Sequence, residues 1–337
     1  MRKTALFVLF AFIVLLSGCR VSCEQENTVV ASYVTSWTEV MPDAFLTTHL
    51  NYAFAHVNES FDGVRIDSLD RLKAIVSLKQ KNPDLKVILS IGGWGSGNFS
   101  EMAADKALRR SFCRDCARKA KALSLDGIDI DWEYPGNGKG ALISWSARDR
   151  DNFTLLMKDL RKALGRNKVL SLASCCDPKY IDFPAIMDAV DFVNIMSYDM
   201  NEGDSTFHCA LYPSVHTATW TTDSSVKAHI AAGVPAGKIV VGVPFHGKGK
   251  RSYPGGRSFK RIHPVPEGYV EMWDEQANAP YIADSEGNFV LGYENERSLA
   301  DKIQYIRDNG LRGIMNWDYA GDDTDFTLTR IMHTLAE

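Results

Sequence analysis

Eight short segments rich in apolar and β-branched residues recur along the chain, and helical periodicity separates most of them. The apolar segments begin near residues 29, 50, 86, 126, 169, 191, 238 and 311, and helices are expected over Leu69–Lys81, Glu101–Leu125, Asp149–Leu164 and Arg297–Asp308. Strands that alternate with helices form a parallel sheet. Eight such units, with no glycine-rich phosphate loop after the first strand, favour an α/β fold of the (β/α)8 TIM-barrel type over an open doubly wound sheet.

One connection is too long for a simple barrel. The segment from His246 to Gly310, between the seventh and eighth strands, contains only one expected helix. Within it, the stretch APYIADSEGNFVLGY predicts two strands around a turn at Asp284–Asn288. We therefore expect a short insertion that forms one wall of a cleft.

The first residues of the chain have the character of an export signal. Arg2 and Lys3 precede a run of mostly apolar residues that is too short to span a bilayer comfortably. The following Leu16-Ser17-Gly18-Cys19 resembles a bacterial lipobox, which implies cleavage before Cys19 and lipid attachment to that residue. An ordinary secretory signal, in which Cys19 is incidental, is the alternative.

These segments give the expected domain organisation. It comprises a lipoprotein signal peptide at 1–18, a tether at 19–28 and a catalytic barrel at 29–337 that carries a reduced insertion at about 247–296. We therefore expect an exported protein, anchored through Cys19 to the periplasmic or surface side of a bacterial membrane and not spanning it.

Composition narrows the classes of partner. The 337 residues are 45% hydrophobic and 24% charged, with a formal net charge of −4. This balance supplies no basic stripe, so nucleic acid is not an expected partner and the substrate should be neutral or nearly so. No cofactor or metal is expected.

The cysteines admit several interpretations. Export would permit disulfides, but their pairing cannot be read from the sequence. Cys113 and Cys116 lie three apart in a helical pattern, which favours packing over zinc or redox chemistry. Cys175 and Cys176 are adjacent at an expected strand end, so they should face opposite ways and at most one could meet Cys209.

The stretch DGIDIDWE contains the densest candidate chemistry. On a β-strand, Asp129, Asp131 and Glu133 share one face, while the apolar residues between them share the other. Like charges about 7 Å apart in a site closed from water keep at least one carboxyl protonated near neutral pH, as a general acid requires. A solvated acidic face on an edge strand is the alternative, but the apolar neighbours suit a strand covered by helices.

The three acids should differ in depth. Active sites of such barrels lie at the carboxyl ends of the strands, so Glu133 should be nearest the cleft, with Asp131 deeper and Asp129 deeper still. We expect Asp129 to share a proton with Asp131, which would let Asp131 turn towards either neighbour and act as a relay.

These motifs together resemble glycoside hydrolase family 18, the chitinases and their relatives. The stretch at 126–133 fits the pattern DGxxDxDxE, Ser90–Gly93 resembles the family's SxGG, Met196–Asp199 resembles its sixth-strand motif, and Trp317 stands at the position of its eighth-strand tryptophan. The stretches YENERSLADKI and GLRGIMNWDYAGDD are similar to the chitinase branch in particular. His246 is a departure, because many chitinases have tyrosine there.

The resemblance implies substrate-assisted hydrolysis with retention. Glu133 would protonate the glycosidic oxygen while the 2-acetamido group of the sugar attacks its own anomeric carbon. Asp131 would stabilise the resulting oxazolinium ion, and Tyr198 would hold the acetamide oxygen. The resemblance also places Met196, Asp199 and Trp317 around the same sugar.

Several residues keep two interpretations. Tyr33 and Phe54 either line the site or pack in the core, and Gly92 and Gly93 either make a tight strand exit or give room to substrate. Trp317 and Tyr198 could also be core aromatics of the barrel. The aromatic residues expected in loops are Trp37, Trp94, Tyr134, Trp145, Trp220 and Trp273, of which we take Trp94 as a substrate-binding candidate.

The expected function is a retaining glycosidase that cleaves β-1,4 linkages in chitin or chitooligosaccharides. Its partner would be a polymer or oligomer that contains N-acetylglucosamine. An endo-β-N-acetylglucosaminidase that cuts the chitobiose core of N-glycans is an alternative within the same chemistry. A non-hydrolytic sugar-binding protein is an alternative of another class, although such relatives typically lack the acid at the position of Glu133.

Overall fold

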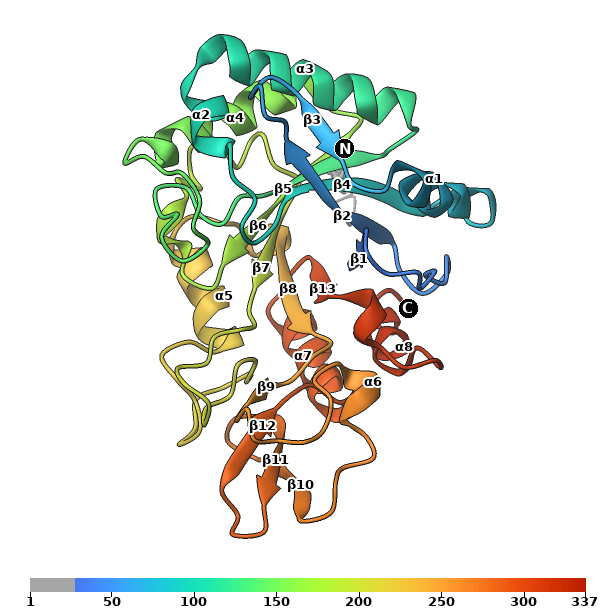
Figure 1. Ribbon diagram of the computed structural model, residues 1–337, viewed down its shortest axis with the longest axis vertical. Coiled ribbons are helices and arrows are strands. Elements are labelled where there is room, and N and C mark those ends of the chain that lie inside the picture. The colour runs from blue at the N-terminus through green and yellow to red at the C-terminus, as the bar shows by residue number, and fades with distance from the viewer. Residues whose placement is uncertain (1–27) are drawn as a thin grey trace, which may run out of the picture.

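Eight parallel strands close into a barrel, with helices around its outside, in the computed structural model, which describes residues 28–337 (Figure 1). The strands are β1 (Val29–Thr35), β2 (His49–Val57), β4 (Lys86–Gly92), β5 (Gly127–Asp131), β6 (Val169–Cys175), β7 (Phe192–Met196), β8 (Ile239–Pro244) and β13 (Gly313–Trp317). β1 pairs with both β2 and β13, which closes the sheet. The predicted TIM barrel is confirmed. The predicted signal and Cys19 lie outside the described residues.

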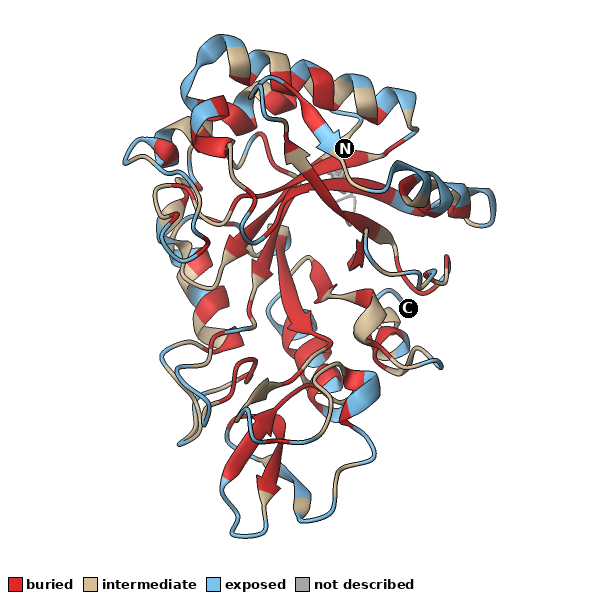
Figure 2. Ribbon diagram, in the orientation of Figure 1, coloured by how far each residue is buried: buried red, intermediate tan, exposed pale blue. Residues whose placement is uncertain are grey.

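The two faces of the barrel strands have different environments. On β5, Ile128 and Ile130 point outward and join the large core between barrel and helices, and Trp132 just beyond the strand joins the same cluster. Asp129 lies on the opposite face, in register with Ser90 of β4 and Ser171 of β6. The strands are almost wholly buried, whereas the helices expose their outer surfaces (Figure 2). This alternation is what directs the acidic positions into the barrel.

The helices follow the predicted order with several differences. They are α1 (Leu69–Ser77), α2 (Phe99–Ala104), α3 (Lys106–Ala122), α4 (Asp149–Leu164), α5 (Thr222–Ala231), α7 (Glu296–Asp308) and α8 (Thr327–His333). The single helix expected over 101–125 is wrong, because Asp105 is extended and its side chain caps α3 by accepting from the amides of Ala107 and Leu108. Within 28–337, no helix is long and apolar enough to cross a membrane.

Some elements were not predicted. β3 (Val64–Ile66) adds an antiparallel strand to β2. α5 has its apolar residues spread around the helix, so its periodicity is weak, although a capping box between Thr221 and Ser224 marks its start. Between β6 and β7 the described chain has only a short 3-10 turn, Pro178–Tyr180, in place of an α-helix.

The insertion between β8 and β13 forms a small antiparallel sheet. Its strands, in spatial order, are β10 (Tyr269–Asp274), β11 (Ala279–Asp284), β12 (Phe289–Gly292) and β9 (Lys248–Gly249), and the short helix α6 (Phe259–Ile262) precedes β10. The strand pair predicted around the turn at 284–288 is confirmed as β11 and β12. Figure 1 shows this sheet, in orange, as a lobe at the lower end of the molecule.

A buried ion pair connects the end of the insertion to the barrel helix that follows it. The Lys302 ammonium on α7 donates to the Glu294 carboxylate, and both side chains are about 1% exposed. Lys302 also donates to the carbonyl of Cys209 at 2.5 Å. Because each charge is paired and hydrogen-bonded, burial of the two groups is tolerated.

Candidate active site

A cavity of about 530 Å³ opens at the carboxyl ends of the barrel strands. The residues that line it come from seven of the eight strands or the loops directly after them, except Lys248, which lies on β9 of the insertion. They are Tyr33, Phe54, Trp94, Asp131, Glu133, Tyr134, Ala173, Cys175, Cys176, Met196, Tyr198, Asp199, Lys248 and Trp317. The carboxyl ends of the strands are where barrels of this kind carry their active sites.

Asp129 lies beneath this cavity, fully buried, and accepts four hydrogen bonds. Its Oδ1 accepts from the Ser171 hydroxyl at 2.7 Å and the Asn194 amide at 3.2 Å. Its Oδ2 accepts from the hydroxyls of Tyr33 and Ser90, both at 2.8 Å. Burial raises the pKa of Asp129, while the four donors lower it by stabilising the carboxylate.

The expected proton sharing between Asp129 and Asp131 is not what the structure shows. Both oxygens of Asp129 are occupied by hydroxyl and amide donors, and the two carboxyl groups form no hydrogen bond in the described chain. The Oδ1 atom of Asp131 is buried without a hydrogen-bond partner. Asp129 therefore acts on Asp131 through its charge, and Asp131 keeps a polar atom free.

Asp131 and Glu133 form a coupled acidic pair at the base of the cavity. Burial raises the pKa of Asp131 well above its usual value, and the charges of Glu133 and Asp129 add to this effect. Burial also raises the pKa of Glu133, to about 7, although a hydrogen bond with the Tyr134 side chain opposes the shift. The pair therefore holds at least one proton near neutral pH.

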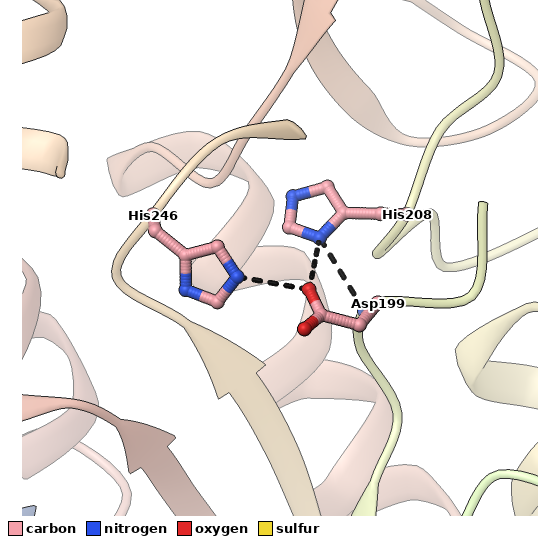
Figure 3. Close-up of side chains that lie close together, drawn as sticks. All are labelled: Asp199, His208 and His246. Atoms are coloured by element: carbon pink, nitrogen blue, oxygen red, sulfur yellow. Dashed lines mark hydrogen bonds and ion pairs between the residues drawn. The ribbon is translucent and has the colours of Figure 1, made fainter. Parts of the chain in front are cut away.

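Asp199, another residue that lines the cavity, lies beside His208 and His246 (Figure 3). Its Oδ1 lies 2.9 Å from Nε2 of His246 and 3.3 Å from Nδ1 of His208, and its Oδ2 lies 2.8 Å from the Lys248 ammonium. Partial burial opposes ionisation, but these partners hold the pKa of Asp199 well below its usual range. Asp199 is therefore an ionised, fully partnered carboxylate.

The same group is the described chain's candidate for a metal site. Asp199, His208 and His246 each offer one ligand atom, and these atoms lie within 4.8 Å of one another. A cation there would have to replace both histidine–carboxylate contacts and lie beside the Lys248 ammonium. The arrangement suits a carboxylate that is hydrogen-bonded to two imidazoles and ion-paired with Lys248 better than it suits a cation site.

Trp317 provides an apolar surface in the cavity. Its ring stacks on Phe54 with centroids 5.6 Å apart and meets Tyr33 edge-on at 5.8 Å. Tyr33 and Phe54 are 2% and 6% exposed, so each serves both as core and as lining. Trp94 is more open, and its ring lies 6.4 Å from that of Tyr134.

Tyr198 and Met196 lie where the motif predicts them, on the side of the cavity formed by β7. Burial raises the pKa of Tyr198 well above its usual value, with a further contribution from the charge of Asp131. Its hydroxyl therefore stays protonated at physiological pH and can donate a hydrogen bond.

The two glycines at the end of β4 do not line the cavity. A Cβ on Gly92 would lie 1.9 Å from the carbonyl oxygen of Asp131, and one on Gly93 would lie 2.5 Å from the Phe54 ring. Both have positive φ, and the Gly93 amide donates to the Asp131 carbonyl at 2.9 Å. Close backbone packing, which positions Asp131 and Phe54, therefore explains both glycines without contact to a ligand.

The sequence did not identify some lining residues. Lys248 lies on β9, whose path could not be inferred, and Ala173 carries no chemical signal. The pair Cys175 and Cys176 was considered only for disulfide pairing, although a position at the end of a barrel strand was the signal available. Of the six loop aromatics, Trp94 and Tyr134 are among the lining residues.

Comparison with known proteins agrees with this geometry. Residues 29–322 match the sequence profile of glycosyl hydrolases family 18. Chitinase A1 of Niallia circulans is 29% identical, over 89% of this chain and 48% of its own length. Endochitinase of Manduca sexta is also 29% identical, over 82% of this chain and 58% of its own length. The chain thus spans about half the length of these relatives.

The solved structures include a similar fold. A glycoside hydrolase family 18 N-acetylglucosaminidase from Paenibacillus barengoltzii is 33% identical, with a TM-score of 0.82, and the match covers 92% of this chain and 100% of that one.

Proposed function

Because the chain belongs to glycosyl hydrolases family 18 and is a chitinase-like glycosidase, we propose that it cleaves β-1,4 linkages of chitin or chitooligosaccharides with retention, by substrate-assisted catalysis. The observation that carries the proposal is the buried, proton-holding pair Asp131 and Glu133 in a cavity with a stacked aromatic surface. Relatives named as chitinases and as an N-acetylglucosaminidase support this class of substrate.

In this mechanism the carboxyl of Glu133 protonates the glycosidic oxygen and later accepts a proton from water. Its pKa of about 7 suits both steps, since a general acid–base group works best near the ambient pH. The free Oδ1 of Asp131 can accept from the acetamide N–H as that nitrogen gains positive charge. The Tyr198 hydroxyl, kept protonated by burial, donates to the acetamide oxygen.

The acetamide is the best-placed nucleophile in this arrangement. Asp131 ends β5 and Glu133 follows two residues later, so the two carboxyls approach the substrate from a similar direction. They therefore do not lie on opposite sides of the scissile glycosidic bond, as a nucleophile and an acid must. Asp199 lines the cavity from the loop after β7, but both of its oxygens are engaged by His208, His246 and Lys248. A carboxylate whose oxygens are engaged by an ammonium and two imidazoles is a weak nucleophile.

Substrate tests decide between the candidates. Chitooligosaccharide should be cleaved with initial release of the β-anomer, seen by proton NMR of the fresh digest, and its fully deacetylated counterpart should resist. The α-anomer first, or comparable cleavage of the deacetylated chain, would contradict substrate assistance. Cleavage of a high-mannose glycopeptide in place of chitooligosaccharide would assign the endo-β-N-acetylglucosaminidase activity instead, and binding of both without cleavage would indicate a sugar-binding protein.

We also propose that a lipid on Cys19 holds the exported enzyme at a bacterial membrane. The support is the sequence of the first residues, which lie outside the described part of the chain.

A further inference from the structure

Two adjacent thiols lie in the cavity at the end of β6. Cys175 is the last residue of the strand and Cys176 lies in the bend that follows, and both line the cavity. The expectation that they face opposite ways is wrong, because the alternation of side chains ends with the strand. Their Sγ atoms are 3.9 Å apart, within reach of a hydrogen bond between the thiols.

The two thiols differ in character. The hydrogen bond with Cys176 lowers the pKa of Cys175 to about 6, although burial opposes this; the backbone of Asp177 and the side chain of Tyr134 contribute further hydrogen bonds. The same hydrogen bond, with burial, raises the pKa of Cys176. Cys175 is thus suited to attack first, as a thiolate, and Cys176 is suited to remain a thiol during that first step.

The other described cysteines lack this environment. Cys113, Cys116 and Cys209 are 2% exposed or less, and burial raises the pKa of each thiol. They provide inert controls in the same chain.

We propose that Cys175 and Cys176 form a thiol-modification site inside the sugar-binding cavity, whose ligands are low-molecular-weight disulfides. The Cys175 thiolate attacks one sulfur of R–S–S–R, so that a Cys175–S–S–R bond forms and R–S⁻ leaves and takes up a proton. Cys176 then loses its proton to water and attacks Sγ of Cys175, which expels the second R–S⁻. The protein dithiol is oxidised to a Cys175–Cys176 disulfide, and the reagent is reduced to two R–SH.

The geometry makes this modification reversible. Neighbouring Cα atoms across a trans peptide are about 3.8 Å apart, shorter than the roughly 4.4–6.8 Å that disulfides favour. A disulfide between adjacent cysteines is therefore strained and readily reduced.

The mixed disulfide, which exists before the Cys175–Cys176 disulfide closes, places the group R in the cavity beside Glu133 and Tyr134. The group R therefore blocks the sugar site. That inhibition rests on the proposed function, whereas the thiol chemistry does not.

Oxidised glutathione tests the site on the full chain. Peptide mass mapping of the native protein should show a glutathione adduct on Cys175, followed by a Cys175–Cys176 peptide lighter by two hydrogen atoms, with Cys113, Cys116 and Cys209 unmodified. The Cys176→Ser variant should stop at the adduct, and Cys175→Ser should form neither product. The control Cys209→Ser should react as the wild type does.

Hydrolysis is measured in parallel, with each rate normalised to the same variant untreated. The Cys176→Ser adduct should reduce chitooligosaccharide cleavage about tenfold or more, with recovery after dithiothreitol, because the adduct occupies the cavity. Unmodified Cys175 after treatment, or equal labelling of the buried cysteines, would overturn the site. Full adduct formation with undiminished cleavage would contradict the proposal that the modified Cys175 lies in the sugar-binding site. An enzyme that forms the adduct but cleaves nothing before treatment would refute only the proposed function.

Discussion

The rate of hydrolysis should fall above neutral pH, because Glu133 must carry a proton when it meets the glycosidic oxygen. Burial raises the pKa of this carboxyl to about 7, and the charges of Cys175 and Asp199 contribute. Above the pKa of a single essential acid, the protonated fraction drops about tenfold per pH unit. We therefore expect kcat/KM to decrease on the alkaline side of its pH profile. It should be about half-maximal near pH 7 and about a hundredth of its maximum two pH units above that.

Asp199→Asn tests the electrostatic part of this reasoning. The change removes a negative charge that raises the pKa of Glu133, so deprotonation becomes easier and the alkaline limb should move to lower pH. The amide keeps the shape of the side chain, although KM should rise because Asp199 lines the cavity. Asp70→Asn is the matched control, because the Asp70 side chain on α1 is 97% exposed. The alkaline limb of its pH profile should coincide with that of the wild type.

The assay is kcat/KM for a soluble chitooligosaccharide across the pH range, because this ratio reports the pKa values of the free enzyme. A wild-type alkaline limb near the ordinary glutamate pKa of about 4.3 would refute the burial argument. A limb that stays fixed in Asp199→Asn, or that moves equally in Asp70→Asn, would refute the contribution of Asp199.

Three further changes test other parts of the molecule. Glu133→Gln should keep oligosaccharide affinity by calorimetry yet lower kcat about a hundred- to ten-thousandfold, and turnover within tenfold of wild type would exclude Glu133 as the acid. Lys302→Met should lower the free energy of unfolding, measured in urea, by about 3–5 kcal/mol, because the buried Glu294 carboxylate loses its ion-pair partner. The double variant Lys302→Met/Glu294→Leu should regain most of this free energy. Equal losses in the single and double variants would contradict this account. Cys19→Ser should move the protein from the membrane to the soluble fraction with unchanged activity, and membrane retention would argue against the lipid anchor.

The barrel was predictable because its signals are local and repeated. Each buried strand is a short apolar run, and the order of strands and helices limits the possible topologies to few. The single helix expected over 101–125 failed at Asp105, a capping residue inside an otherwise continuous apolar pattern. α5 was missed because its apolar residues do not fall on one face, so tertiary packing decides its conformation.

The site was predictable where its residues lie on strands or directly after them. Alternation along β5 gives the order of Asp129 and Asp131, with Glu133 just beyond the strand, and the motif that begins at the end of β7 gives Tyr198 and Asp199. The rest depends on loops that cross the barrel end: Cys176 turns into the cavity because β6 has ended, and Lys248 reaches Asp199 from the insertion. Such placements are set by three-dimensional contacts between segments distant in sequence, which one sequence does not encode in any local pattern.

The position of Asp129 shows how the barrel core contributes to the chemistry. Its four donors come from β1, β4, β6 and β7, each one placed by strand register beneath the cavity. Four donors can stabilise a carboxylate even where burial opposes the charge. Burial is the main cause of the raised pKa of Asp131, and the negative charges of Glu133 and Asp129 add to it, which keeps a proton within the pair of Asp131 and Glu133. Asp129 is thus a positioning residue whose effect is electrostatic, and it does not need to meet the substrate.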